Sequence, residues 1–260
     1  MTAQIKRAIK AGNSSAVILP RAWLNKEIRV ELVRKSKEDI LIDTLNIIKS
    51  YIDLKSIIGV YLSGSYARGD EDEDSDIDVL VVTNNVDKEL VKKDIYSILI
   101  ISSEQIKLKL KNDLLPIGQM VKEASVLLNS DYLNSLEVKP TKKNLNWHIK
   151  TTQEKLKLIK KIIKGMEKRS IDRVNDKVVY TLILRIRTLY IIQRLIENKK
   201  YSKRDFLNLI LKLSGKDAYE SYLRVKDDKK VKDIILLEDV KNLCNYLEKQ
   251  LTEIKGKLQQ

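Results

Sequence analysis

The sequence is organised around residues 59–82, which read GVYLSGSYARGDEDEDSDIDVLVV. Two apolar runs, at residues 57–63 and 77–82, enclose a polar segment that begins with Gly64 and Ser65. The runs have the length of short buried strands, and a glycine lets the backbone approach a ligand closely. Exposed N–H groups at such a turn, together with a serine hydroxyl, suit a phosphate. This stretch therefore predicts two strands and a ligand-binding turn between them.

Two aspartates mark the start of the second predicted strand. Asp76 and Asp78 are two residues apart, so both side chains point to the same face of a sheet. Carboxylates this close repel each other, and a divalent cation such as Mg²⁺, which prefers oxygen ligands, removes that cost. The acidic residues 70–74 read as a solvated loop without a role. A phosphate site beside two metal-binding carboxylates predicts phosphoryl or nucleotidyl transfer.

The whole motif resembles a known signature. The pairs GS at 64–65 and RG at 68–69, followed by SDID at 75–78, resemble the polymerase-β-type nucleotidyltransferases. The likeness is greatest to the minimal nucleotidyltransferases and the kanamycin nucleotidyltransferase group. The resemblance implies an α/β domain with a short mixed sheet. It also implies transfer of a nucleoside monophosphate from a nucleoside triphosphate to an acceptor hydroxyl, with ATP and AMP as the favoured pair.

The resemblance carries roles to individual residues. It implies that Gly64 and Ser65 hold the β- and γ-phosphates of the nucleotide. Asp76 and Asp78 then bind Mg²⁺ or Mn²⁺. Arg68 supports the phosphate loop or an acidic neighbour.

One departure from the family pattern concerns the third carboxylate, which lies on the following strand and completes the metal site or acts as general base. Residues 94–104 read DIYSILIISSE, with no acid in the middle of the strand. Asp94, just before it, is the candidate, and Glu104, just after it, is the alternative. A third possibility is that no such carboxylate exists. The loss of a general base lowers a rate by roughly 10²–10⁴-fold, and it is also consistent with a domain that only binds nucleotide.

The N-terminal residues 4–33 predict a small β unit. A turn at residues 11–15 separates an alternating segment at 4–10 from a short apolar run at 16–19, and a second alternating segment at 28–32 predicts a closing strand. So short a segment cannot bury a core alone. The runs GNS at 12–14, VILP at 17–20 and the closing strand resemble the swapped-hairpin DNA-binding unit of the AbrB and MazE type.

That second resemblance implies a homodimer whose N-terminal strands interlace and contact DNA. The alternative is a hairpin that only decorates the next domain. The candidate DNA contacts are Lys6, Arg7, Lys10 and Arg21.

Residues 141–258 show helical periodicity and predict an up-and-down bundle. The bundle resembles the helical domain of the kanamycin nucleotidyltransferase group and the HEPN bundles. HEPN ribonucleases use an Arg followed four to six residues later by a His, and Arg185 and Arg187 have no such His, so nuclease activity is rejected. These arginines and Arg194 either lie at the bundle surface or form an anion-facing patch above the active site. His148 and Cys244 read as packing residues.

Composition limits the remaining possibilities. The 260 residues contain one cysteine and one histidine, which excludes an intramolecular disulfide, a cysteine-based zinc site and any mechanism that needs two histidines. No apolar run approaches the roughly 20 residues that span a bilayer, so a cytoplasmic protein without membrane contact is expected. The net charge of +14 is uneven, because an acidic segment at 35–130 lies between basic ends. Basic faces attract polyanions, above all nucleic acid, although lysine can also be the ordinary surface residue.

Together these features predict an α+β chain with three parts. They are a swapped-hairpin DNA-binding segment at 1–34, a nucleotidyltransferase domain at 35–138 and an all-α helical bundle at 139–260. The predicted activity is Mg²⁺-dependent nucleotidyl transfer to a hydroxyl on a protein, an RNA or a small molecule. The alternative is an antitoxin-like DNA-binding regulator whose nucleotidyltransferase domain binds nucleotide without turnover.

Overall fold

A five-stranded mixed sheet forms the centre of the first half of the chain. The computed structural model describes residues 6, 8–30, 35–72, 75–88 and 90–259. The strand order is β5-β6-β4-β3-β7, and only β4 and β6 run parallel. The strands are β3 (Ile57–Ser63), β4 (Ile77–Thr83), β5 (Val91–Lys93), β6 (Tyr96–Ser102) and β7 (Ser125–Leu128).

The register of the sheet brings the Gly64–Ser65 turn and the aspartates at 76 and 78 together. β3 and β4 are antiparallel, and Ser63 at the end of β3 pairs with Asp78 near the start of β4. Gly64 follows Ser63 directly, so the turn and the aspartates lie at the same end of the sheet. Long-range pairing of two buried strands therefore places the predicted phosphate loop beside the predicted metal ligands.

Alternation along β4 decides which side of the sheet each helix covers. Val79 and Val81 are fully buried on the face covered by α1 (Lys37–Ile48), whereas Leu80 and Val82 are buried on the opposite face. That second face packs against α3 (Ser103–Asn112) and α4 (Ile117–Glu123). The connecting helices α2 (Gly64–Arg68) and α5 (Ser130–Asn134) are short. Because both faces are covered, the strands are apolar almost throughout.

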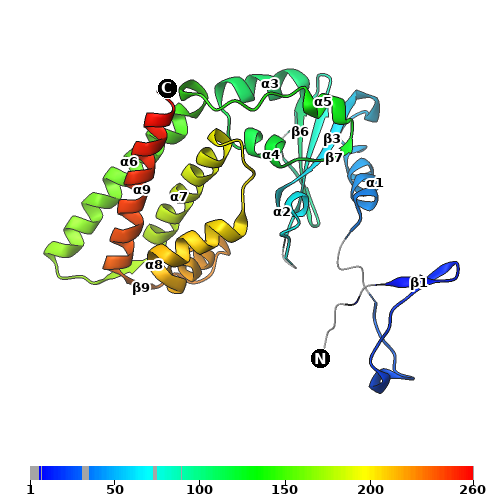
Figure 1. Ribbon diagram of the computed structural model, residues 1–260, viewed down its shortest axis with the longest axis horizontal. Coiled ribbons are helices and arrows are strands. Elements are labelled where there is room, and N and C mark those ends of the chain that lie inside the picture. Colours follow the sequence, from blue (N-terminus) through cyan, green and yellow to red (C-terminus); the bar gives the residue numbers. More distant parts are fainter. Residues whose placement is uncertain (1–5, 7, 31–34, 73–74, 89, 260) are drawn as a thin grey trace.

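Four long helices form the second half and lie beside the sheet domain (Figure 1). They are α6 (Lys142–Lys168), α7 (Asp176–Ile196), α8 (Lys203–Lys226) and α9 (Leu237–Lys257). The helical bundle and the α+β class are thus confirmed, and Cys244 is a buried core residue, as expected. Helix α8 has a kink near its middle, where Gly215 has a φ of 72°.

The bundle also contains a β ribbon, which the all-α prediction missed. The strands β8 (Arg173–Asn175) and β9 (Asp233–Leu236) pair antiparallel between the helices. They come from the α6–α7 and α8–α9 connections, about sixty residues apart along the sequence. Such short segments carry little periodicity of their own, and only the packing of the helices brings them together.

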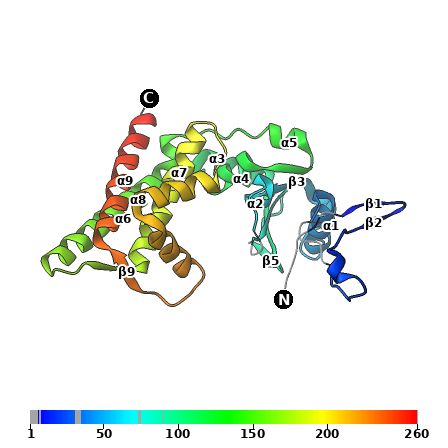
Figure 2. The same ribbon diagram turned by 60° about the horizontal axis from the view of Figure 1, so that its bottom comes forward.

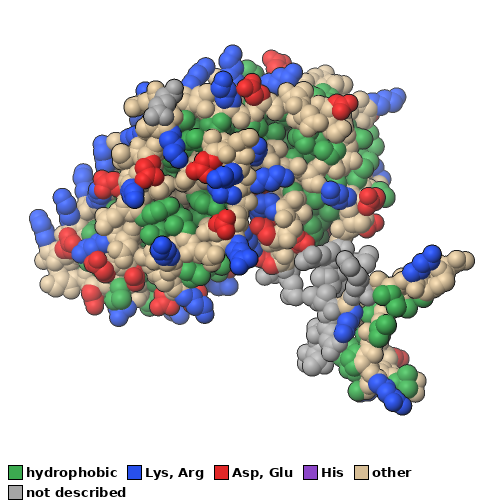
Figure 3. Space-filling model, in the orientation of Figure 1, with side chains coloured by type: hydrophobic (Ala, Val, Ile, Leu, Met, Phe, Trp, Pro, Cys, Tyr) green, Lys and Arg blue, Asp and Glu red, His purple; other side chains and the backbone are tan. Residues whose placement is uncertain are grey.

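The N-terminal segment stands away from the rest of the chain (Figures 1 and 2). It has a hairpin of β1 (Ile9–Ala11) and β2 (Ser14–Ala16), followed by the 3-10 turn η1 (Arg21–Trp23). None of its described residues is buried, and Figure 3 shows hydrophobic side chains on its surface. Its large exposed apolar side chains are Ile9, Ile18, Leu24, Ile28 and Val30.

The closing strand predicted at 28–32 is absent from residues 28–30, the part of it that the structure describes. Within the described chain, β1 and β2 pair only with each other, and residues 28–30 join neither strand. Lys6, Lys10 and Arg21 are exposed, and Arg7 lies outside the described residues. Among the described residues, no helix has the length and hydropathy of a membrane span.

Candidate active site

A cavity of about 640 Å³ lies between the sheet and the bundle. Its volume falls within the range of pockets that hold a single small ligand. One wall comes from the motif at residues 59–82. The other comes from α7, α8 and the segment that joins them. Residues on the first wall include Ser63, Gly64, Ser65, Arg68, Asp76 and Asp78, and residues on the second include Arg187, Tyr201, Lys203, Tyr219 and Tyr222.

Gly64 is required at its position for two reasons. Its φ of +66° lies in the left-handed region that other residues adopt at a cost. In addition, a Cβ at this residue would stand 2.1 Å from Oδ2 of Asp78, far inside van der Waals contact. The Asp78 carboxylate therefore lies directly against the turn, and any side chain at residue 64 would displace it.

Asp76 and Asp78 form a close carboxylate pair at the edge of the cavity. Burial raises the pKa of Asp78, and the charge of Asp76 raises it further, against the opposing effects of Arg68 and Arg187. No group of three or more His, Cys, Asp or Glu residues in the described chain could hold a metal ion. Two carboxylates nevertheless suit Mg²⁺, which keeps several waters and takes further ligands from substrate phosphates.

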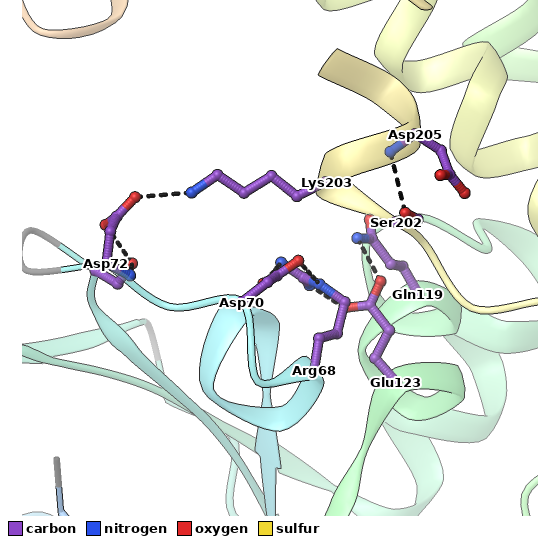
Figure 4. A network of polar contacts seen from close by, with 9 residues as sticks. Arg68, Asp70, Asp72, Gln119, Glu123, Ser202, Lys203 and Asp205 are labelled. Carbon is purple, nitrogen blue, oxygen red and sulfur yellow. Dashed lines mark hydrogen bonds and ion pairs between the residues drawn. The ribbon is translucent and has the colours of Figure 1, made fainter. Parts of the chain in front are cut away.

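Arg68 has two acidic partners, Asp70 within the motif and Glu123 on α4, and the second links the motif to that helix (Figure 4). It donates to Glu123 at 2.6 Å and to Asp70 at 3.1 Å. Glu123 is 2% exposed, and burial raises its pKa although Arg68 and Gln119 oppose the shift. Sequence reasoning placed Arg68 near a phosphate loop or an acid. It missed Glu123, which lies 55 residues further on, and it gave Asp70 no role.

The bundle wall is cationic and aromatic. The guanidinium of Arg187 lies 5.5 Å from the centre of the Tyr201 ring, and that of Arg68 lies 5.1 Å from it. Burial raises the pKa of Tyr201 to about 12, so its hydroxyl stays protonated at neutral pH. One aromatic ring therefore contacts an arginine from each half of the molecule.

The three arginines of α7 differ in their surroundings. Arg187 lines the cavity, in the position that an anion-facing residue would take. Arg185 instead donates to the Thr151 hydroxyl at 3.3 Å, and Arg194 packs on Tyr190 at 5.8 Å. Helical spacing alone could not separate them, because only the position of α8 determines which arginine faces the sheet domain.

An ion pair crosses the cavity mouth between the two halves (Figure 4). Lys203, at the start of α8, donates to Asp72 at 2.7 Å. Hydrogen bonds from Lys203 and Ser75 lower the pKa of Asp72 to about 2. The acidic loop is thus in contact with the bundle at this point, where the sequence indicated only a solvated loop.

Asp94 is not brought to the cavity. It occupies the tight turn between β5 and β6 with a φ of 51°, and its side chain is exposed. A two-residue hairpin turn needs such a conformation, which Asp tolerates better than most residues. Glu104, in the first turn of α3, follows the other end of β6. Neither acid is among the described residues that line the cavity.

Comparison with known proteins gives one match to a family. The family described as "Nucleotidyltransferase domain" matches residues 44–208, which is more than half of the chain. The match includes the sheet, α6, α7 and the start of α8, and it excludes the N-terminal unit. A search of curated proteins found no match.

Among solved structures, a nucleotidyltransferase-like protein from Exiguobacterium sibiricum 255-15 shows 12% sequence identity and a TM-score of 0.39. The alignment covers 84% of this chain and 77% of that one.

Proposed function

The chain belongs to the nucleotidyltransferase domain family and is a transferase, and we propose that it moves a nucleoside monophosphate, with AMP favoured, from a nucleoside triphosphate to an acceptor hydroxyl. The observation that carries this proposal is that Gly64 and Ser65 line the same cavity as Asp76 and Asp78. Family membership indicates the reaction class. The acceptor is a hydroxyl of a protein, an RNA or a small molecule.

In the proposed reaction, the acceptor oxygen attacks the α-phosphorus of the nucleotide. A new P–O ester bond forms, the bond from the α-phosphorus to the bridging oxygen breaks, pyrophosphate leaves, and the hydroxyl proton is released to water. The backbone of the Gly64–Ser65 turn and the Ser65 hydroxyl hold the terminal phosphates. Asp76 and Asp78 hold Mg²⁺ or Mn²⁺, which neutralises charge on the phosphates when it is bound.

The opposite wall of the cavity adds positive charge and flat surfaces. Arg187 and Lys203 are placed to attract the triphosphate, and rings such as Tyr201 and Tyr222 offer surfaces on which a nucleobase can stack. We propose that the bundle completes the nucleotide site. The family match supports this, since it continues from the sheet through α7.

Label transfer tests this function. The purified chain is incubated with Mg²⁺ and each α-labelled nucleoside triphosphate, with and without host protein and RNA. Label should appear on an acceptor and disappear in Asp76→Ala/Asp78→Ala. The matched control is Asp113→Ala/Asp131→Ala, which removes two exposed carboxylates outside the cavity and should keep activity. Transfer that persists in the first double variant would contradict the proposed site.

A second candidate function is an antitoxin-like DNA-binding regulator that binds nucleotide without turnover. The observation in its favour is that neither Asp94 nor Glu104 lines the cavity. Nucleotide binding that needs both Asp76 and Asp78, without any label transfer, would favour this candidate.

We further propose that residues 1–34 form a dimeric DNA-binding unit, followed by a catalytic domain at 35–138 and a helical domain at 139–260. The exposed apolar side chains of the N-terminal segment support dimerisation, because so small a segment cannot bury them by itself. DNA contacts are assigned to Lys6, Lys10 and Arg21, and to Arg7.

Sedimentation tests the proposed dimer. The full chain should sediment as a dimer, and a chain that starts at residue 35 should sediment as a monomer with weaker DNA binding. If the truncated chain dimerises and binds DNA as well as the full chain, the assignment is wrong.

A further inference from the structure

Helix α6 carries an unusual excess of positive charge. Its 27 residues include nine lysines and only two glutamates, so this helix alone supplies half of the net charge of the chain. Helix α9, also in the bundle, balances four lysines with four acidic residues. A general preference for lysine on the surface would have enriched both helices alike, so the excess on α6 needs a separate explanation.

Six of these lysines lie on one face of the helix. Their spacings of seven, seven, four, three and four residues follow the helical period, and all six are exposed. The stripe runs for about 37 Å, from the rise of 1.5 Å per residue. We call it the α6 basic face, and its members are Lys143, Lys150, Lys157, Lys161, Lys164 and Lys168.

The opposite face of α6 packs into the core through residues such as Leu156, Ile159 and Ile163. The basic face therefore points outward as a consequence of packing. Figure 3 shows basic side chains projecting along the outline on the left, where Figure 1 places α6.

Within the part of the chain that the structure describes, none of the six lysines forms an ion pair, and one exposed acid, Glu154, lies on the same face between Lys150 and Lys157. Their neighbour Lys160, on the flank of the helix, pairs with Glu248 of α9 at 2.6 Å. On the basic face, Lys157, Lys161 and Lys164 follow one another at helical spacing, which places like charges side by side and disfavours the helix. A bound polyanion would relieve this repulsion.

We propose that the α6 basic face binds the phosphate backbone of a nucleic acid. Its length corresponds to about eleven base pairs at 3.4 Å each, so several phosphates can face the six ammonium groups at once. A membrane is disfavoured as the partner, because a helix that lies on a membrane turns a continuous apolar face to it. The main apolar stripe of α6 is buried, and only Trp147, Leu158 and Ile162 are large apolar side chains exposed on the described helix. A protein partner is disfavoured because protein interfaces are depleted of lysine.

This surface is separate from the candidate active site. No residue of α6 is among the described residues that line the cavity. Nucleic-acid binding on α6 therefore stands whether or not the cavity transfers nucleotides.

Fluorescence anisotropy with labelled 12-base-pair DNA and RNA duplexes and a 12-nucleotide single strand, over a salt series, tests the proposal. The test variant is Lys157→Gln/Lys161→Gln/Lys164→Gln in the full chain. The matched control is Lys212→Gln/Lys216→Gln/Lys249→Gln, which removes three exposed lysines from α8 and α9. The slope of log affinity against log salt should fall in magnitude by roughly two to three in the test variant, at about 0.9 per lost phosphate contact of a duplex, and stay unchanged in the control.

Two further arms keep the result interpretable. Replacing the same three lysines by Arg should retain binding, because arginine also pairs with phosphate. The variant Lys10→Gln/Arg21→Gln shows how much of the nucleic-acid binding comes from the N-terminal segment. Equal losses in the test and control triples, or no loss in either, would overturn the proposal. Polyglutamate of the same charge binding as tightly as the duplexes would also overturn it.

Discussion

Two buried carboxylates, each paired with an arginine, behave in opposite ways in this molecule. Asp176, at the start of α7, is fully buried and joins α7, α8 and the segment before β9. It accepts from the Ser221 hydroxyl at 2.7 Å, from Arg224 at 2.8 and 2.9 Å, and from the Lys232 N–H at 2.9 Å. Burial alone would raise the pKa of Asp176, but these donors hold it below its ordinary value.

Glu123 is almost as buried, yet among the described residues it accepts only from Arg68 and Gln119, at 2.6 and 2.9 Å. Its pKa is raised by burial and by the nearby charge of Asp70. Asp176 accepts hydrogen bonds from three residues and Glu123 from two, and in each acid the direction of the pKa shift follows the balance between burial and these donors. Asp176 holds α7, α8 and the segment before β9 together. Glu123 lines the cavity and orients Arg68.

The largest expected effect on stability comes from removing the carboxylate of Asp176. Asp176→Ala should lower the free energy of unfolding by about 3–5 kcal/mol, because it leaves Arg224 without its partner. Thermal denaturation followed by circular dichroism should show a fall in Tm of roughly 10 °C. Glu220→Ala, which breaks an exposed pair with Lys216 on α8, is the control and should cost less than about 1 kcal/mol. Equal losses of stability in the two variants would show that the buried Asp176 contributes no more than an exposed ion pair.

Removing the charge of Glu123 should reduce activity more than stability. Glu123→Gln leaves Arg68 with Asp70 alone, so the guanidinium should shift beside the phosphate loop. A misplaced positioning residue can lower kcat/KM by up to about 10²-fold. Steady-state kinetics with separate kcat and KM values checks this, and Glu123→Asp should recover part of the loss. A change in Tm without a kinetic change would make Glu123 purely structural.

The two acids should affect the acid dependence of stability with opposite signs. The lowered pKa of Asp176 means that its contribution is present above the unfolded value of about 3.9 and is lost as pH falls through the folded value. The raised pKa of Glu123 means that the folded chain binds its proton more tightly, so stability decreases as pH rises above about 4.3 towards the folded value. Urea denaturation of the wild type between pH 2 and 7 should show these opposite slopes, and each should disappear in the variant that lacks the group, Asp176→Asn or Glu123→Gln.

The smallest expected effect concerns the exposed pair at the cavity mouth. Lys203→Gln should cost only about 0.2–1 kcal/mol, because solvent screens Asp72 and Lys203. The loss should shrink further in high salt. Denaturation at low and high salt measures it, and a larger loss that salt does not change would show that this contact holds the two halves together.

Local patterns in the sequence predicted a substantial part of the molecule. The two-residue spacing of Asp76 and Asp78, the glycine that follows an apolar run, and the helical stripes of the bundle all depend on residues close together in the chain. The α+β class and the transferase activity were predictable for this reason. The same local view gave Asp94 a catalytic role, although its position demands a turn residue.

Tertiary structure alone decided which distant residues surround the motif. Glu123, Arg187 and Tyr201 reach it from α4, α7 and the segment before α8, and no spacing in the sequence relates them to residues 64–78. The β8–β9 ribbon likewise exists only because the helices bring two short segments together. Periodicity determines which side of an element is buried, but long-range packing determines what that side meets.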